Sequence, residues 1–185
     1  MVEVWRLVRN PYGRAAYDRL QSAGVTATLM TEYRSGLPAS APGNDNAVTT
    51  DIVPPERVAR IGAPTAELRP EEAVVAALDG DDPVGYLFCS VGETHRIEPL
   101  ERERTFDGAY VRRVFVSPDH RQRGVATALL SAACEWAADR GARTATALVA
   151  RDNVPSRRLF EHNGFEAARA HLYIRLGSLR VRRSY

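Results

Sequence analysis

The second half of the chain alternates between apolar runs of strand-like composition and segments with apolar residues at helical spacing. From Val125 to position 140 apolar residues recur every three or four positions, and Gly141 ends this predicted helix. A shorter helix is predicted within "VPSRRLFEHNG", with Pro155 in its first turn and Gly164 at its end. The apolar runs predict strands at 108–116, at 143–150 and, as one strand or two with a bend, at 165–176. Strands that alternate with helices predict an α/β layer architecture with some parallel pairing.

The first half is less regular and carries more turn-forming residues. "EEAVVAAL" and "VGYLFCSV" are apolar runs separated by "DGDDP", which predicts a hairpin of 74–78 against 84–91. "GETHRIEPLERERT" follows as a polar connection. The upstream composition predicts a strand at 2–8, a helix from Pro11 to Gly24, a long surface loop at 31–55 and a short helix near 55–61.

Composition places the chain among folded globular proteins. Of its 185 residues 44% are apolar, so we expect one domain over 1–185 with a sizeable core. Within it we expect a variable part at 1–70, a core at 71–176 and a basic tail at 177–185. No apolar run reaches the length of a membrane span and charged residues interrupt the N-terminal positions, so we expect a cytoplasmic protein without a secretory signal. Cys89 and Cys134 stand far apart within apolar patterns, which favours two buried free thiols.

All 25 basic residues are arginine, and the absence of lysine bears on function. A P-loop nucleotidase, a pyridoxal enzyme and a protein kinase each need a specific lysine, so the sequence argues against all three classes. The four histidines and the two cysteines are scattered without metal-ligand spacing, so we expect no metal site. The net charge of +2 is too small to indicate nucleic acid as a partner.

The stretch "SPDHRQRGVATALL" turns from a loop directly into the predicted helix, with no Asp, Ser or Thr immediately before it as a cap. An uncapped helix N-terminus exposes unpaired N–H groups and about half a positive charge. Arg121 and Arg123 add positive charge, and Gly124 lets a ligand approach the backbone. Thr127 offers a hydroxyl. These features predict an anion site with phosphate as its usual occupant; a glycine tolerated at a helix start, beside solvated arginines, is the alternative.

Two segments of the second half carry a recognisable order of features. In the first, a strand ending in Val-Phe-Val-Ser-Pro leads to Arg121-x-x-Gly124-x-Ala126 and an amphipathic helix. In the second, "NVPSRRLFEHNGF", an asparagine, a short helix and Asn-Gly-Phe follow one another. The spacing between the two leaves room for one helix and one strand. They resemble motifs A and B of the GNAT superfamily of acyl-CoA N-acyltransferases, and the resemblance covers about residues 70–176.

The resemblance implies a mixed, mostly antiparallel sheet of about six to seven strands flanked by helices, whose fourth and fifth strands splay apart around acyl-CoA. It implies an N-acetyltransferase that moves an acetyl group from acetyl-CoA to a primary amine of a small molecule or of a protein N-terminus, by direct attack in a ternary complex. A non-catalytic acyl-CoA-binding regulatory domain is the alternative. The coenzyme-binding residues that it implies are Val114, Phe115, Val116, Arg121, Gln122, Arg123, Gly124, Val125, Ala126, Thr127, Asn153, Ser156 and Phe160.

Two positions depart from the residues that usually handle protons in this family. Many members carry Glu where this chain has Tyr110, and Tyr where it has Phe160. Three alternatives follow: water relays the proton and the thiolate leaves unaided, Tyr110 or Tyr173 supplies a hydroxyl, or the protein binds acyl-CoA without catalysis. The backbone N–H of Val116 could bind the oxyanion in the catalytic alternatives.

Other charged residues have weaker claims on function. His95, Glu101, Glu103 and Asp107 precede the strand at 108–116, near the expected acceptor opening, but solvated loop positions explain them more simply. The arginines of "RAHLYIRLGSLRVRRSY" could favour an acidic acceptor or nucleic acid, but the outward face of a terminal strand explains them better. We therefore expect acetyl-CoA and an amine as partners, expect neither membrane nor nucleic acid, and leave a homodimer open.

Overall fold

The computed structural model of the protein describes residues 25–38 and 48–185. The strand predicted at 2–8 and the helix predicted from Pro11 to Gly24 lie outside these residues. The described helices are α3 (Pro55–Ala59), α4 (Val125–Asp139) and α5 (Val154–His162). The described strands are β1 (Val25–Gly36), β2 (Thr49–Ile52), β3 (Ala73–Asp79), β4 (Asp82–Val91), β5 (Thr94–Ile97), β6 (Arg102–Thr105), β7 (Ala109–Val116), β8 (Thr144–Ala150), β9 (Glu166–Leu176) and β10 (Leu179–Ser184).

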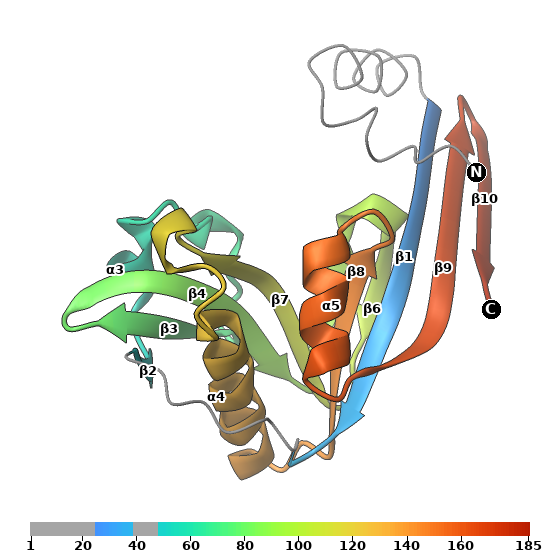
Figure 1. Ribbon diagram of the computed structural model, residues 1–185. Helices are drawn as coiled ribbons and strands as arrows, with labels where there is room; N and C mark the ends of the chain where they lie inside the picture. The colour runs from blue at the N-terminus through green and yellow to red at the C-terminus, as the bar shows by residue number, and fades with distance from the viewer. Residues whose placement is uncertain (1–24, 39–47) are drawn as a thin grey trace.

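The centre of the fold is an eight-stranded sheet with the order β10-β9-β1-β8-β7-β4-β3-β2. Its neighbours are antiparallel except for β7 and β8, which are parallel, and β5 and β6 form a separate two-stranded hairpin. This confirms the expected mixed, mostly antiparallel sheet, with more strands than the six to seven expected. In Figure 1 the sheet opens into a V between β7 and β8, with α4 beside the β3–β4 half and α5 beside the half that contains β8 and β1.

Most of the predicted helices and strands that fall within the described residues are confirmed by the structure. The predicted hairpin is formed by β3 and β4, and β9 is one continuous strand. The loop predicted at 31–55 is wrong at both ends: Thr31–Gly36 belongs to β1 and Thr49–Ile52 forms β2, while 39–47 lie outside the described residues. The connection predicted before β7 is also more ordered than expected, because it forms the β5–β6 hairpin. The tail forms β10, whose side chains are exposed, as expected for a terminal strand.

The main core lies between α4 and the sheet. The helix buries one stripe at helical spacing, including Val125, Leu129, Ala133 and Ala137, against β3, β4 and β7. Cys89 and Cys134 are buried free thiols in this core, which confirms the prediction, and burial raises the pKa of both. The core therefore fixes the position of α4, and with it the direction in which the first turn of that helix points.

A buried ionic cluster links the β5–β6 hairpin to the half of the sheet that contains β1, β9 and β10. Glu32 of β1 is 1% exposed and accepts two hydrogen bonds from Arg104 of β6, at 2.6 and 2.7 Å. His171 of β9 lies 2.8 Å from Glu32 through Nε2 and 2.9 Å from Ser184 of β10 through Nδ1. Each charged group and each imidazole nitrogen of this cluster has a partner. The cluster therefore joins four strands, namely β1, β6, β9 and β10.

Two negative findings apply to the described part of the chain. None of the helices in residues 25–38 and 48–185 is long and apolar enough to span a membrane. Within the same residues, no three His, Cys, Asp or Glu side chains are grouped so that they could hold a metal ion.

Candidate functional site

A β-bulge interrupts β7 where it pairs with β4. Tyr86 faces Phe115 and Phe88 faces Arg112, so the single residue between them on β4 faces two residues of β7. Arg113, one of these two, has a φ of 57°, which is rare for a residue with a side chain. A bulge bends its strand and turns local backbone groups out of the ladder, and bulges are frequent beside functional sites.

The parallel pairing of β7 with β8 ends just before this bulge. It joins only Ala109–Val111 to Ala145–Ala147, and beyond it the strands separate. The resulting β7–β8 cleft has a volume of about 360 Å³. It brings together five of the predicted coenzyme-binding residues, from β7 and from α5 with its N-cap: Val114, Phe115, Asn153, Ser156 and Phe160. The splayed strands expected from the sequence are therefore present.

The backbone of Val116 faces away from β4. The N–H of Ser117 donates to the carbonyl of Val84 at 2.8 Å, and alternate residues of an antiparallel strand point their backbone groups to opposite sides. The N–H and C=O of Val116 therefore point toward the separated side of β7. Its carbonyl accepts a hydrogen bond from Arg121 Nε at 3.0 Å. The predicted oxyanion role of the Val116 N–H stays a prediction.

The first turn of α4 has no side-chain cap and no acidic residue, as the sequence indicated. Gly124 is the N-cap residue with a φ of 75°, and Gln122 before it has a φ of 60°. The adjacent α4 cavity has a volume of about 720 Å³. It is lined by predicted coenzyme-binding residues, namely Val116, Arg121, Gln122, Gly124, Val125, Ala126 and Thr127, together with residues of α5. Arg123 does not line it.

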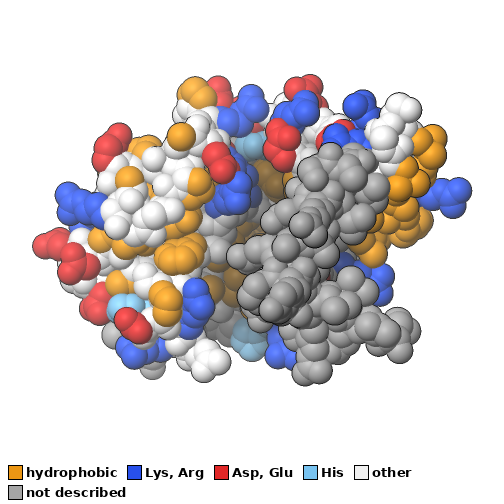
Figure 2. Space-filling view, turned by 90° about the horizontal axis from the view of Figure 1, so that it is seen from above, with side chains coloured by type: hydrophobic (Ala, Val, Ile, Leu, Met, Phe, Trp, Pro, Cys, Tyr) orange, Lys and Arg blue, Asp and Glu red, His pale blue; other side chains and the backbone are white. Residues whose placement is uncertain are grey.

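The α4 cavity and the β7–β8 cleft adjoin one another. Phe115 and Ser156 line the cleft, whereas the next residue of β7, Val116, and the preceding residue of α5, Pro155, line the cavity. Seen from above, the surface is hollowed between the two halves of the molecule, with basic and acidic side chains around the hollow (Figure 2). The hollow thus runs from an uncapped helix N-terminus along a separated strand edge.

A third hollow, the β5 cavity, lies at the other end of the cleft and has a volume of about 610 Å³. It shares Arg112, Arg113 and Leu148 with the β7–β8 cleft, so the two meet at the bulge. Tyr110 also lines it. The three hollows therefore form one path through the sheet, with the bulge at the junction of the last two.

The two tyrosines predicted to supply a hydroxyl lie in one apolar cluster, but only one lines the β5 cavity. Tyr110 is 6% exposed, its ring lies 4.0 Å from that of Phe106, and burial raises its pKa to about 12. Tyr173 is 1% exposed and packs in the same cluster without lining the cavity, with the Arg182 guanidinium 5.1 Å from its ring centre. Tyr110 therefore faces the cavity and Tyr173 does not, and the hydroxyl role predicted for either residue stays a prediction.

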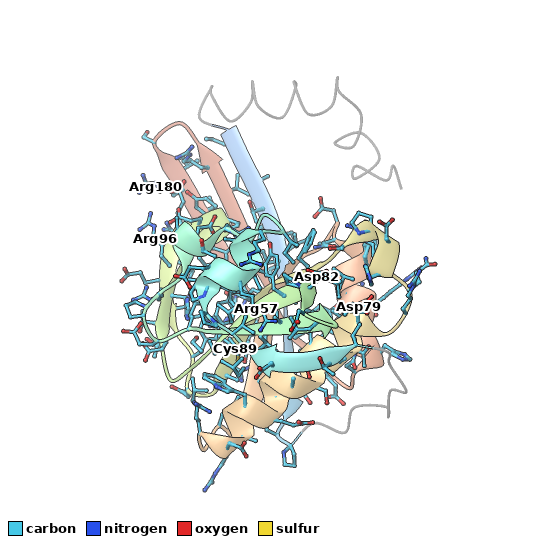
Figure 3. All side chains as sticks on the ribbon, turned by 90° about the vertical axis from the view of Figure 1, so that its left-hand side faces the viewer. Arg57, Asp79, Asp82, Cys89, Arg96 and Arg180 are labelled. Atoms are coloured by element: carbon cyan, nitrogen blue, oxygen red, sulfur yellow. The ribbon has the colours of Figure 1, made fainter. Side chains whose placement is uncertain are left out.

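His95 is not the solvated loop residue that the sequence suggested. It lies on β5, is 4% exposed and lines the β5 cavity. Its neighbour Arg96 lies at the edge of the molecule (Figure 3) and lines the same cavity, but its side chain is exposed and its Nε donates to Glu98 at 2.8 Å. Glu101 is also engaged, since its carboxylate lies 2.9 Å from Arg175. No signal in the sequence paired His95 with its buried contacts.

His95 contacts two residues from other segments that sequence reasoning missed. Its Nε2 lies 2.7 Å from Ser90 Oγ on β4, and its Nδ1 lies 4.0 Å from Glu72 Oε1, just before β3. Glu72 in turn accepts hydrogen bonds of 2.6 Å from both Nε and a terminal nitrogen of Arg112. A polar cluster thus stands behind the wall of the β5 cavity.

Comparison with known families assigns the chain. Residues 45–165 match the acetyltransferase (GNAT) family, and the chain belongs to that family. An uncharacterized N-acetyltransferase of Methanocaldococcus jannaschii is 34% identical over 84 residues, which are 45% of this chain and 34% of that protein. The chain thus spans about a third of the length of this curated relative.

Solved structures share the fold at low sequence identity. A GCN5-related N-acetyltransferase from Kribbella flavida is 18% identical with a TM-score of 0.58, over 86% of this chain and 63% of that one. The structure of AAC(6')-Iy in complex with the bisubstrate analog CoA-S-monomethyl-acetylneamine is 19% identical with a TM-score of 0.50, over 64% of this chain and 90% of that one. At these identities the likeness establishes the fold.

Proposed function

We propose that the protein transfers an acetyl group from acetyl-CoA to a primary amine, carried by a small molecule or by a protein N-terminus, through direct attack in a ternary complex. Membership of the acetyltransferase family supports the reaction class. The path formed by the α4 cavity, the β7–β8 cleft and the β5 cavity supports an arrangement in which acetyl-CoA lies at one end and the amine at the other.

The donor side of this path fits the parts of coenzyme A. The pyrophosphate would lie on the first turn of α4, where uncapped N–H groups and the helix dipole favour an anion. Arg121 beside this turn adds positive charge. The pantetheine arm would pair its amides with the backbone of Val114 and Val116, because a separated strand edge accepts a peptide-like partner.

The acceptor side would be the β5 cavity. Its junction with the cleft at Arg113 is where an amine would meet the thioester carbonyl. Attack forms the C–N bond, places negative charge on the carbonyl oxygen and then breaks the C–S bond. AAC(6')-Iy, which was solved with the bisubstrate analog CoA-S-monomethyl-acetylneamine, supports such a two-sided arrangement for this fold.

One observation carries the proposal: the uncapped first turn of α4 and the bulge of β7 stand at opposite ends of a single separated strand edge. A phosphate group and a thioester at the two ends of one extended ligand match that layout. A protein that only needed a stable sheet would gain nothing from interrupting the pairing of β7 with β8.

An acceptor screen tests the function. We would incubate the protein with acetyl-CoA and a panel of primary amines and protein N-terminal peptides, and detect acetylated products by mass spectrometry. We expect at least one acceptor to gain an acetyl group at a rate proportional to protein concentration. A thermal shift with acetyl-CoA but no product with any amine would contradict the catalytic function.

That contradicting outcome defines the second candidate, a non-catalytic acyl-CoA-binding regulatory domain. The observation that favours it is Phe160, which lines the β7–β8 cleft at a position where many members of the family carry an acidic hydroxyl. Its ring is 2% exposed and cannot donate a proton. Thiol release measured with and without an amine separates the two candidates.

A further inference from the structure

The His95 cluster, made of Glu72, Ser90, His95 and Arg112, is a buried set of polar side chains with no role yet assigned. Ser90 is 1% exposed, and the side chain of Glu72 is fully buried. Burial of a carboxylate is costly unless it is paired, and Arg112 provides the pair through two hydrogen bonds of 2.6 Å. Glu72 and Arg112 therefore satisfy each other, which leaves His95 to be explained.

The two buried histidines of the described structure differ in one respect. Both ring nitrogens of His171 have hydrogen-bond partners, Glu32 and Ser184, as expected for a joint between strands. In His95 only Nε2 has one, Ser90 Oγ at 2.7 Å. Its Nδ1 makes no hydrogen bond with any residue that the structure describes, and Glu72 Oε1 lies 4.0 Å from it. His95 thus keeps one nitrogen available at the wall of the β5 cavity.

We propose that His95 Nδ1 is the general base that takes a proton from the ammonium group of the acceptor in the β5 cavity. This role rests on the proposed function. In the tautomer that this role requires, Ser90 Oγ accepts the hydrogen bond from Nε2–H, which leaves a lone pair on Nδ1. Glu72 stabilises the imidazolium that forms, because its carboxylate lies 4.0 Å from Nδ1.

The protons balance in this scheme. The acceptor R–NH₃⁺ gives one proton to His95, and the neutral amine attacks the thioester carbonyl carbon. The C–N bond forms, the C–S bond breaks, and the second proton lost by nitrogen goes with the departing sulfur to give the free thiol. Imidazolium returns its proton to water, so each turnover converts ammonium and thioester into amide, thiol and one released proton.

The charges around His95 favour its neutral form at rest. Burial is the largest influence and lowers the pKa of the imidazole, while the Glu72 carboxylate raises it. Arg112 of β7 lowers it, as does Arg69 from the segment before β3, where Glu71 acts in the opposite sense. Arg104, opposite His95 on β6, is bound to Glu32. A neutral imidazole near neutral pH is the state that a base requires.

Tyr110 is a poorer base than His95 at this cavity. Its ring centre lies 4.9 Å from that of His95, so both could reach the same ligand. Burial raises the pKa of Tyr110 to about 12, which leaves its hydroxyl protonated and unable to accept a proton from an ammonium group near neutral pH. Its ring instead packs against His95 and holds the imidazole at the cavity wall.

The test compares wild type with His95→Gln on two acceptors. The first is the best amine from the screen, and the second is a fluorinated analogue of it whose amine is already neutral at the assay pH. We expect His95→Gln to lower kcat/KM about 100-fold or more on the first amine, since general bases contribute that much. We expect a far smaller loss on the analogue, which needs no base for its first proton.

The pH profile gives a second signature of the same role. In His95→Gln the residual kcat/KM should rise as pH approaches the pKa of the acceptor amine, so the deficit narrows at high pH. If the substitution only disturbed the structure, kcat/KM would fall by the same factor for both amines at every pH. That result would overturn the proposal. His171→Gln is the matched control, because it changes the other buried histidine and should leave the ratio of the two amines as in wild type.

Two measurements guard against failures that have other causes. Calorimetry with acetyl-CoA verifies that each variant keeps its donor site, and wild type without activity on any amine would sink the proposed function itself. If His95→Gln does not fold, nitrogen NMR shifts of wild-type His95 decide: neutral imidazole with the proton on Nε2 supports the assignment. A proton on Nδ1, or a ring that stays charged near neutral pH, would contradict it.

Discussion

Asn163 Nδ2 donates a hydrogen bond to Thr127 Oγ1 at 3.3 Å, and so joins the start of α4 to the end of α5 beside the α4 cavity. The same nitrogen donates to the carbonyl of Leu159 at 2.7 Å. Asn163 is 2% exposed and Thr127 is 9% exposed, so this contact is shielded from water. The hydroxyl that the sequence offered as a phosphate ligand is thus part of the link between the two helices.

Asn163→Ala should therefore destabilise the fold and weaken the donor site. Loss of two hydrogen bonds from a buried amide should lower the free energy of unfolding by about 1–3 kcal/mol, measured by urea denaturation. We also expect weaker acetyl-CoA binding, because the first turn of α4 loses its tie to α5. Thr127→Val removes only the hydroxyl, and the double variant should cost less than the sum of the two. Full additivity would show that the two side chains do not interact energetically.

Gly124→Glu should reduce acetyl-CoA affinity at least tenfold, about 1.4 kcal/mol or more, measured by calorimetry. The variant forces a side chain into a φ of 75° and places a negative charge at the helix N-terminus where the pyrophosphate is proposed to bind. Gly141→Glu is the control, because Gly141 has a similar φ of 82° beyond the other end of α4. If Gly124→Glu and wild type are both folded and bind acetyl-CoA with equal affinity, the coenzyme does not bind at this end of α4.

Arg121 and Arg123 should contribute unequally to coenzyme binding, although both are predicted from the sequence to bind the coenzyme. Arg121 lines the α4 cavity and Arg123 does not. Arg121→Gln should raise the Kd for acetyl-CoA several-fold and flatten its dependence on salt, which screens charges over roughly 8 Å at ~0.15 M. Arg123→Gln should do less of both. A larger effect of Arg123→Gln would mean that its side chain, and not that of Arg121, reaches the phosphates; comparison with dephospho-coenzyme A would then locate the 3′-phosphate.

Acid should destabilise the protein through the Glu32 cluster. Burial alone would raise the pKa of Glu32, but hydrogen bonds from Arg104 and His171 outweigh it and hold the pKa at about 2. Since the folded-state pKa is lowered, the unfolded chain binds the proton first, and stability present above pH 4.5 is lost as pH falls toward about 2. The loss is on the order of 3 kcal/mol.

His171 adds to this loss at milder pH. Burial is the main cause of its lowered pKa, so the unfolded chain takes up a proton below about 6.5 while the folded ring resists it. Denaturant unfolding between pH 7 and pH 3 should give a falling free energy for wild type. Glu32→Gln should be less stable at pH 7 and should lose less on acidification; parallel curves for the two proteins would exclude Glu32 as a source of the acid sensitivity.

The helices and strands that the sequence predicted correctly are those whose ends are marked by nearby glycine, proline or turn residues. α4 lies between Gly124 and Gly141, α5 has Pro155 in its first turn and Gly164 after its end, and β3 and β4 flank a turn-rich stretch. The uncapped first turn of α4 was readable because it depends only on adjacent residues. The resemblance to the GNAT motifs implied which two strands separate, and the β7–β8 cleft agrees with it.

The elements that the sequence missed depend on distant partners. β1 contains the charged Glu32, which is buried only because Arg104 and His171 arrive from far along the chain. The β5–β6 hairpin reads as a polar connection, yet His95 is buried by Ser90 and by the ring of Tyr110. Such contacts exist only after folding, so local pattern predicts a loop where tertiary structure makes a strand.

Phe160→Tyr should raise kcat if departure of the thiolate limits the reaction. Phe160 lines the β7–β8 cleft, where the sulfur of a bound donor would lie. A hydroxyl on this ring could donate a proton to the sulfur, and a well-placed acid contributes roughly tenfold to a hundredfold. Its ring lies 6.1 Å from that of Tyr33 and 5.2 Å from that of Phe165, so the added oxygen needs a polar partner or water. Steady-state thiol release on the best amine is the measurement.

Phe165→Tyr is the matched control for this prediction. Phe165 is as buried as Phe160, at 2% exposure, and belongs to the same core cluster, but it does not line the cleft. It should bring the same cost of a buried hydroxyl without any gain in kcat. A gain in neither variant, with acetyl-CoA binding intact, would mean that the leaving group does not limit turnover. The slow step would then lie elsewhere, and deprotonation of the amine by His95 is the proposed step to test next.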